Sequence, residues 1–371
     1  MINPLPKPRL LCAALLLAAL AGCRPAPPPV MESTVANHAV RVEVGAAVDN
    51  QLPQVAGAAI ALMTETLSDL DATRAGSDLH KLNRVASSVR LQVARETFRL
   101  IDLAHHYGAL TGGAFDMTAA PLEEVWGLGA GGVTPEEEPA DTLLEGIRAG
   151  VGHDHVQISD QGAVAFTAPN TKIGFRLLAP AYALDLAVLD LRRRGFSSVS
   201  VQLGGVRRVL GMRSPAEAWS ADLPHPYTVG DTIGQVNLGD SKSALAVVRL
   251  YERTMRFGER TYGHILDPRS GRPAEGTVLA AVLAPSATMA QALAQALLVL
   301  GVEGAPEVLR DFPKCEALIM PDQRPEAIWA TPGFAARLVA RPPLASRVSV
   351  LEVPVLSPVE PAEEPAPAPD S

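Results

Sequence analysis

Residues 180–205 read Pro-Ala-Tyr-Ala-Leu-Asp-Leu-Ala-Val-Leu-Asp-Leu-Arg-Arg-Arg-Gly-Phe-Ser-Ser-Val-Ser-Val-Gln-Leu-Gly-Gly. The proline near the start, the arginine run near the end and the glycine after it predict a helix over 180–194. Val199, Val201 and Leu203 then alternate with polar residues, which predicts a strand that ends at the Gly-Gly pair. A helix followed at once by a strand favours a domain in which helices pack on a sheet.

The same mixture of patterns continues on both sides of this stretch. Val40, Val42 and Val44 alternate with polar residues and predict another strand. Further helices are predicted over 54–69, over the stretch that carries Leu91, Ala94, Phe98, Ile101 and Ala104 at spacings of three and four, and over 288–300, where Gly301 ends the helix. The order of the elements favours an α+β or mixed α/β fold over an all-β fold.

The composition allows a large core and argues against a nucleic-acid partner. The chain has 371 residues, of which 47% are hydrophobic and only 4% aromatic, and its formal net charge is −8. We therefore expect a core built mainly of Leu, Val and Ala. No basic stripe and no interleaving of basic with aromatic residues is present, so no nucleic-acid partner is expected.

The start of the chain resembles a bacterial lipoprotein signal. Lys7 and Arg9 precede an apolar run over 10–20, which is too short to span a bilayer. The following Leu-Ala-Gly-Cys resembles a lipobox, so cleavage before Cys23 and lipidation of its thiol are expected. An ordinary signal peptide with an incidental cysteine is the alternative. The lipid would tether the chain to a membrane of the cell envelope, facing the periplasm, and Arg24 favours the outer membrane over the inner one.

These features predict four parts of the chain: a signal peptide over 1–22, a Pro-rich linker over 23–37, one folded domain over 38–345, and a disordered Pro- and Glu-rich tail over 346–371. Cys12 is removed with the signal peptide, and Cys23 carries the lipid. A disulfide within the chain is therefore excluded. The remaining Cys315 is expected to be a buried structural thiol rather than a catalytic one.

Three segments carry residues suited to a ligand site: 111–118 (Thr-Gly-Gly-Ala-Phe-Asp-Met-Thr), 264–273 (His-Ile-Leu-Asp-Pro-Arg-Ser-Gly-Arg-Pro) and the helix over 290–301. Paired glycines let a backbone approach a ligand closely, and a histidine beside an Asp-Pro turn is suited to act as a base. Together with 77–83 (Ser-Asp-Leu-His-Lys-Leu-Asn), these segments resemble the FAD:protein FMN transferases, the ApbE-type family, over about 40–301.

The resemblance implies a single T-fold-like domain with a flavin cleft, in which FAD and Mg²⁺ bind. It implies transfer of FMN from FAD to a threonine of an acceptor, here an exported protein of a redox complex, with release of AMP. Ala114, Phe115 and Asp116 match the family's flavin-contacting segment, and Ile265 matches a neighbouring flavin contact. His264 matches the family's catalytic base.

The match is incomplete where the family holds its metal and nucleotide. An aspartate and a threonine one turn apart correspond here to Gln291 and Gln295, which keep the spacing but not the charge. A nucleotide-contacting aspartate corresponds to Gly174, and a lysine corresponds to Pro180. The other replaced positions are 36–38, where a flavin-contacting methionine is missing, Leu70, Val206 and 245–248. A conventional Mg²⁺ site cannot be assembled from these residues unless Asp185 or Asp267 compensates.

Two functions therefore stay open: a membrane-tethered FAD:protein FMN transferase with an altered metal site, and a family member without turnover that binds flavin or a partner protein in the envelope. Individual residues also have plain structural alternatives. His264 could cap a turn beside Asp267, Asp116 could be a helix N-cap, and Gln291 with Gln295 could form a solvated stripe. The remaining histidines, His105, His106, His153 and His155, give only weak support for a metal site.

Overall fold

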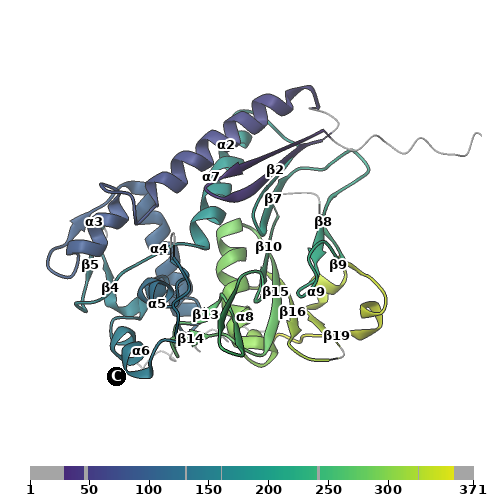
Figure 1. Cartoon of the computed structure of the whole chain (residues 1–371). Coiled ribbons are helices and arrows are strands. Elements are labelled where there is room, and N and C mark those ends of the chain that lie inside the picture. The colour runs from purple at the N-terminus through teal and green to yellow at the C-terminus, as the bar shows by residue number, and fades with distance from the viewer. Residues whose placement is uncertain are drawn as a thin grey trace, which may run out of the picture.

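The computed structural model describes residues 29–45, 49–129, 132–159, 161–239, 243–324 and 326–354. A nine-stranded sheet runs through the molecule in the order β1-β2-β6-β7-β10-β15-β16-β17-β19 (Figure 1). All neighbouring strands are antiparallel except β17 and β19. Their bounds are β1 Val30–Val35, β2 His38–Val44, β6 Val199–Leu203, β7 Val206–Leu210, β10 Ala244–Arg249, β15 Thr277–Ala284, β16 Glu316–Pro321, β17 Ile328–Ala330 and β19 Val348–Val350.

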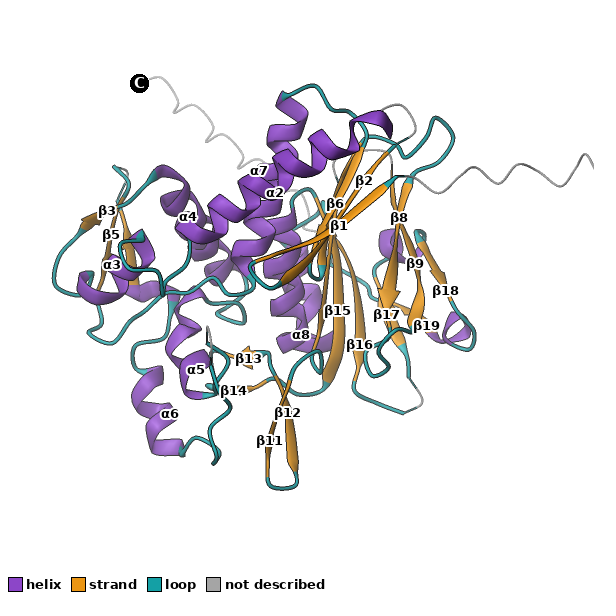
Figure 2. Cartoon of the chain, turned by 45° about the horizontal axis from the view of Figure 1, so that its top comes forward, coloured by secondary structure: helices purple, strands orange, loops and turns teal. Residues whose placement is uncertain are grey.

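Three long helices, α2 (Leu52–Asp69), α7 (Leu178–Arg193) and α8 (Ala287–Arg310), cover one face of this sheet (Figure 2). The predicted end at Gly301 is seen as a break, since its φ of 66° is left-handed, but helical residues resume directly after it. By length and composition α8 could cross a membrane. It packs instead on β10 and β15, with its apolar residues in the core.

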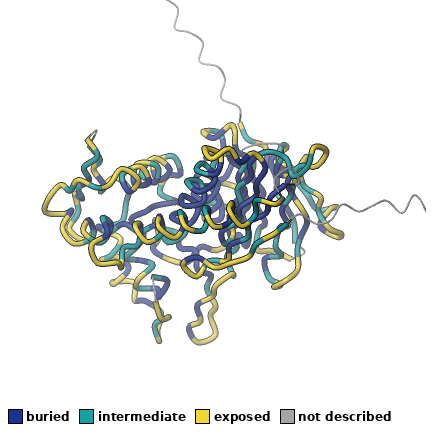
Figure 3. Tube along the Cα trace, turned by 90° about the horizontal axis from the view of Figure 1, so that it is seen from above, coloured by how far each residue is buried: buried dark blue, intermediate teal, exposed yellow. Residues whose placement is uncertain are grey.

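The other face of the sheet is covered by a smaller sheet in the order β18-β9-β8 and by the short helix α9 (Pro332–Ala335). These strands are β8 Trp219–Pro224, β9 Thr232–Gly239 and β18 Leu338–Ala340. Because side chains alternate along a strand, the two faces of the large sheet contribute side chains to two separate cores. In β10, Ala246 packs toward the helices and Leu245 toward the small sheet. Figure 3 shows the buried segments running through the middle of these layers.

A small lobe, residues 70–177, lies between α2 and α7 in the sequence and beside the helix layer in space (Figure 1). Its elements are α3 Asp78–Val85, β3 Leu91–Gln92, α4 Arg95–Leu110, α5 Ala120–Val125, α6 Asp141–Arg148, β4 Val156–Ile158 and β5 Ala163–Phe166, with 3₁₀ turns at Met117–Ala119 and His153–His155. Buried residues of α4 belong to the same core as α7 and α8. The chain therefore forms one domain.

A second contact joins the lobe to the rest of the domain. The hairpin β11 (Thr254–Phe257) and β12 (Arg260–Gly263) projects from the end of the large sheet (Figure 2). Its Met255 and Phe257 pack with Trp126 of the lobe and with Leu266 of the short strand pair β13 (Leu266–Asp267) and β14 (Arg272–Pro273). This cluster fixes the loop that follows β12 against α5.

The expected mixed α/β single domain is confirmed, but three boundaries were wrong. The linker expected over 23–37 contains β1, which pairs with β2 as the edge strand of the large sheet. The tail expected over 346–371 contains β19, which pairs with β17, and Leu351 is buried. The helix expected from Leu91 begins at Arg95, because Leu91 belongs to β3. Residues 1–28 and 355–371, including Cys23, lie outside the described residues.

Candidate functional site

His264 begins the loop that connects β12 to β13 and is 6% exposed. Its Nδ1 lies 3.1 Å from the carbonyl oxygen of Leu250, which can only accept a hydrogen bond. Nδ1 therefore carries the proton, and Nε2 keeps its lone pair. Burial, together with the positive charges of Arg176 and Arg253, lowers the pKa of His264 to about 4. The imidazole is therefore neutral near pH 7, and it does not cap a turn beside Asp267.

The four residues predicted to contact flavin lie together. Ala114, Phe115, Asp116 and Ile265 line one cavity of about 40 Å³, together with side chains from α5, the segment before α7, and α8. Residues 114–116 and 265, which lie far apart in the sequence, are thus brought to one place. Their contact with flavin remains a prediction.

The Asp116 carboxylate is already occupied by hydrogen bonds. Oδ1 accepts bonds from the Thr118 amide (2.8 Å) and hydroxyl (2.5 Å), and Oδ2 accepts one from the His153 amide (2.7 Å). The side chain caps the 3₁₀ turn that leads into α5, as the structural alternative for this residue proposed. The same carboxylate raises the pKa of His153, chiefly through a side-chain hydrogen bond. Asp116 therefore holds the 3₁₀ turn and the start of the His153 turn in place beside the cavity.

A second cavity of about 150 Å³ adjoins the first. It is lined by His38, the Gly204-Gly205 turn, His264 and Gln291, and Leu177 borders both cavities. Pockets that hold drug-sized ligands are typically about 300–1,000 Å³. A dinucleotide therefore fits only if the cavities open further around Leu177.

The residues present do not fit a Mg²⁺ ion. Gln291 is buried rather than part of a solvated stripe, and a Cβ built on Gly174 would lie 2.9 Å from the Cβ of Ala120. Asp185 cannot compensate, because its carboxylate accepts bonds from the amides of Ala287 and Thr288. Asp267 does not compensate either, since it pairs with Arg269. Within the described ranges, no three His, Cys, Asp or Glu side chains are grouped as metal ligands.

Arg176 was not predicted as a site residue. Its guanidinium forms an ion pair with Glu123 of α5 (2.8 Å) and donates a hydrogen bond to the carbonyl oxygen of His264 (3.3 Å). It lines the cavity that holds the predicted flavin contacts. The available signal was a single positive charge in the otherwise apolar run 173–179.

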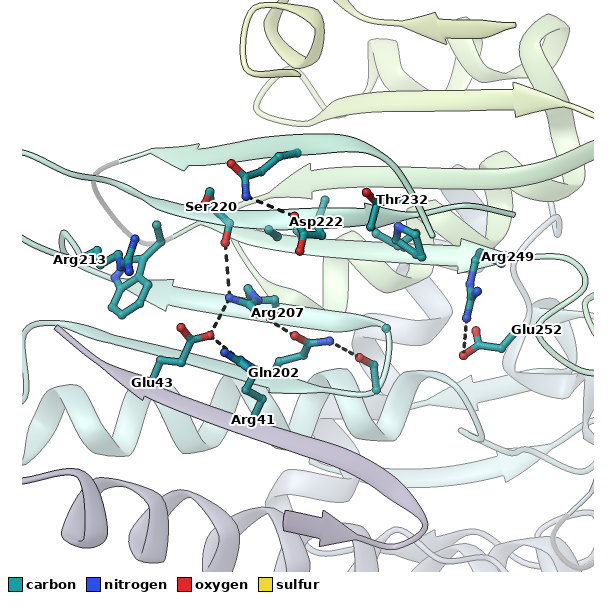
Figure 4. A pocket seen from close by; sticks show the side chains of 18 residues that line it. Arg41, Glu43, Gln202, Arg207, Arg213, Ser220, Asp222, Thr232, Arg249 and Glu252 are labelled. Atoms are coloured by element: carbon teal, nitrogen blue, oxygen red, sulfur yellow. Dashed lines mark hydrogen bonds and ion pairs between the residues drawn. The ribbon is translucent and has the colours of Figure 1, made fainter. Parts of the chain in front are cut away.

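A larger polar cleft, of about 650 Å³, lies on the other side of the large sheet, below β8 and β9 (Figure 4). Arg207 bridges it, with hydrogen bonds to Glu43 (3.1 Å), to Gln202 (2.8 Å) and to the Ser220 carbonyl (3.4 Å). Its charged groups are largely paired with one another, as Arg249 is with Glu252. It contains none of the predicted site residues, so we place the candidate site at His264.

Other predicted positions have structural roles. Cys315 is 7% exposed, its thiol lies 3.4 Å from the Met289 sulfur, and burial raises its pKa to about 12. The expected buried thiol is confirmed. His153 stacks edge-on against His105, with ring centroids 5.6 Å apart, and is held by Asp116.

The ApbE family model matches residues 32–319 of this chain. The chain therefore belongs to the ApbE family of flavin transferases. The relative from Treponema pallidum, named FAD:protein FMN transferase, is 32% identical over 70% of this chain and 75% of its own length. The relative of that name from Salmonella typhimurium is 26% identical over 89% of this chain and 98% of its own length.

Solved structures show the same fold. The ApbE protein from Thermotoga maritima superimposes with a TM-score of 0.73, at 27% identity, over 84% of this chain and 99% of its own. The flavin transferase ApbE from Vibrio cholerae gives a TM-score of 0.71 at 24% identity, over 85% of this chain and all of its own. The mixed α/β domain with its inserted small lobe is thus the fold of this family.

Proposed function

We propose that this protein transfers the FMN half of FAD to a threonine of an acceptor protein. The observation that carries the proposal is the state of His264: a buried, neutral imidazole whose Nδ1 is held by the Leu250 carbonyl, in a cavity next to the predicted flavin contacts. A base held in one tautomer keeps its free nitrogen ready for a proton. Relatives that carry the name FAD:protein FMN transferase support the same reaction.

In this reaction the threonine hydroxyl oxygen attacks the phosphorus of the FMN half. The new phosphoester bond forms as the bond from that phosphorus to the bridging oxygen of the pyrophosphate breaks. AMP leaves with the bridging oxygen and its negative charge. The threonine proton moves to Nε2 of His264, which the Leu250 carbonyl keeps in the correct tautomer. The chain's own contribution is to orient the hydroxyl and accept its proton.

A second candidate function is flavin or partner binding without turnover. The observation that favours it is the loss of carboxylates at the positions of Gln291 and Gly174 and of a threonine hydroxyl at Gln295, together with the small cavities. Such a protein would hold flavin, or a component of an envelope redox complex, in the same cleft.

One experiment separates the two functions. The purified chain is incubated with FAD and with an exported redox subunit or peptide that carries an acceptor threonine, and covalent FMN is read by in-gel fluorescence and mass. We expect an adduct of FMN mass that is lost in His264→Ala and in an acceptor with Thr→Val. FAD binding without an adduct would support the binding function instead. An adduct that persists in His264→Ala would exclude His264 as the base.

We also propose that the protein acts in the cell envelope, as a lipoprotein anchored through Cys23 with its domain facing the periplasm. The support is the basic and apolar leader followed by Leu-Ala-Gly-Cys. Expression of wild type and Cys23→Ser in cells fed a labelled fatty acid tests this. Label and membrane association should be present in the wild type and absent in Cys23→Ser. Membrane fractionation then decides between the outer membrane, which Arg24 favours, and the inner one.

A further inference from the structure

The cleft beside His264 presents hydrogen-bond donors where a metal site would present carboxylates. Gln291 and Gln295 lie one turn apart on α8 and line the two adjoining cavities. The Gln295 amide nitrogen is buried without a hydrogen-bond partner among the described residues, and Gln291 is 5% exposed. Buried amides are normally paired, and an unpaired one calls for an explanation such as a missing ligand.

The charged groups that act on His264 are arginines. Among the charged groups, Arg176 and Arg253 are the ones that shift the pKa of His264 most, and both lower it. Burial lowers the pKa of His38, which also lines the second cavity; Glu252 raises this pKa and Arg176 lowers it. A positive field opposes a divalent cation and attracts an anion.

Arg176 is placed to exchange partners. Its guanidinium now pairs with Glu123, and the side chains of the two residues are 23% and 21% exposed. Glu123 and Arg176 line the same cavity as Gln295. A guanidinium offers five donors in a planar fork that matches phosphate oxygens, so an entering phosphate can take the place of the Glu123 carboxylate.

We infer that this cleft holds the pyrophosphate of FAD directly on the Arg176 guanidinium and the amides of Gln291 and Gln295, without a divalent cation. The inference rests on the proposed function, since it assigns the binding site of that function's donor substrate. Three observations support it independently: the unpartnered Gln295 amide, the two arginines that act on His264, and the lack of room for a carboxylate at Gly174. The Arg176–Glu123 ion pair then belongs to the cleft without FAD, and the pyrophosphate replaces Glu123 when FAD binds.

The test measures binding, which does not require turnover. FAD, ADP and riboflavin are titrated into the purified full-length chain by calorimetry, in EDTA and in Mg²⁺. The variants are Arg176→Met, Arg176→Lys and Glu123→Gln. Arg256→Met is the matched control, because Arg256 is an exposed arginine of the hairpin whose side chain, among the described residues, hydrogen-bonds only to the Gly258 carbonyl. Thermal unfolding of each variant reports on folding.

We expect the affinity for FAD to be the same in EDTA and in Mg²⁺. Arg176→Met should weaken the binding of FAD and ADP by about tenfold or more, because the charge-assisted pair with phosphate is lost, and Arg176→Lys should weaken it by less. Riboflavin, which has no phosphate, should be unaffected. Glu123→Gln should increase the affinity for FAD, since it removes the competing carboxylate. If the ion pair were purely structural, Arg176→Met and Glu123→Gln would both decrease this affinity. Arg256→Met should change nothing.

The failures are distinguishable. FAD binding that requires Mg²⁺, or that is unchanged in both Arg176 variants and in Glu123→Gln, overturns this inference and leaves the proposed function standing. Failure of the wild type to bind FAD in either buffer overturns the proposed function itself. If Arg176→Met does not fold, the test still stands, because Arg176→Lys is expected to decrease the affinity for FAD and Glu123→Gln to increase it.

Discussion

Asn83 of α3 holds both backbone groups of Ile173, ninety residues later in the chain. Its Nδ2 donates to the Ile173 carbonyl at 2.9 Å, and its Oδ1 accepts from the Ile173 amide at 2.8 Å. Ile173 is buried and lies in the segment that leads through Arg176 into α7. The asparagine thus substitutes for a missing strand neighbour and fixes this segment against the small lobe.

Asn83→Ala should therefore destabilise the domain by about 2–4 kcal/mol, because two buried backbone groups lose their partners. Asn170→Ala, at an exposed asparagine in the same lobe, is the control and should have little effect. Chemical denaturation of both variants measures the difference. Equal midpoints for Asn83→Ala and the wild type would contradict the role assigned to Asn83.

Gly174 cannot accept a side chain while Ala120 faces it. A Cβ at Gly174 would lie 2.9 Å from the Ala120 Cβ, closer than real Cβ atoms approach. Gly174→Ala should cost about 1–3 kcal/mol through overpacking. Ala120→Gly costs about 1 kcal/mol alone, since Ala120 begins α5. The double variant should recover most of the Gly174→Ala loss, so a double-mutant cycle by denaturation should show positive coupling; strict additivity would argue against this contact.

Local periodicity was enough to predict the regular elements near the site. The helix over 180–194 and the strand over 199–203 agree with α7 and β6 within about two residues, because each buries one face in a regular repeat. β1 was missed because only its last residue is buried and because prolines precede it. Its position in the sheet depends on backbone hydrogen bonds to β2, and such bonds do not produce a hydrophobic pattern in the sequence.

Site residues could be predicted where a family motif is continuous in the sequence. They could not be predicted where the site depends on contacts between residues far apart in the sequence. His264, Ile265 and the 114–116 segment were located from two short motifs. Arg176 was missed because its place in the site is set by two contacts that are distant in the sequence. Its guanidinium bonds to Glu123, fifty-three residues earlier, and to the His264 carbonyl, eighty-eight residues later. Likewise, Gln291 resembles a surface residue until the packing of α8 on the sheet shows that it is buried.

The pKa of His264 predicts how stability depends on pH. The folded value of about 4 lies below the unfolded value of about 6.5. The unfolded chain therefore binds more protons between these values, and stability should fall as pH drops from about 6.5 toward 4, by at most about 1.4 kcal/mol per unit. His153 contributes with the opposite sign, because Asp116 raises its folded pKa. Its stabilising effect is present below the unfolded pKa and is lost as pH rises through the folded one.

The measurement is the free energy of unfolding between pH 4 and pH 8 for wild type and for His264→Asn, whose amide can still donate to the Leu250 carbonyl. The fall below pH 6.5 should be smaller in His264→Asn. NMR titration should also show the His264 pKa rising in Arg176→Met, because the positive charge that lowers it is removed. A wild-type His264 that titrates near 6.5 would contradict its buried, neutral state.

Asp185 should prove structural rather than a metal ligand. Its carboxylate accepts bonds from the Ala287 amide (2.8 Å), the Thr288 amide (2.9 Å) and the Thr288 hydroxyl (2.6 Å), and it pairs with Arg208. It thus caps the first turn of α8, the helix that carries both glutamines, and neutralises a largely buried guanidinium. Asp185→Ala should cost about 3–5 kcal/mol, because Arg208 is left without its partner.

Asp185→Asn keeps the size of the side chain and an acceptor oxygen, so it should cost less than Asp185→Ala. Melting curves of both variants, recorded in EDTA and in Mg²⁺, separate the two roles. A structural cap gives the same loss in both buffers, since no ion is bound at this carboxylate. A wild type that Mg²⁺ stabilises, with the effect absent in both variants, would show instead that Asp185 binds the ion and that the cleft is a metal site after all.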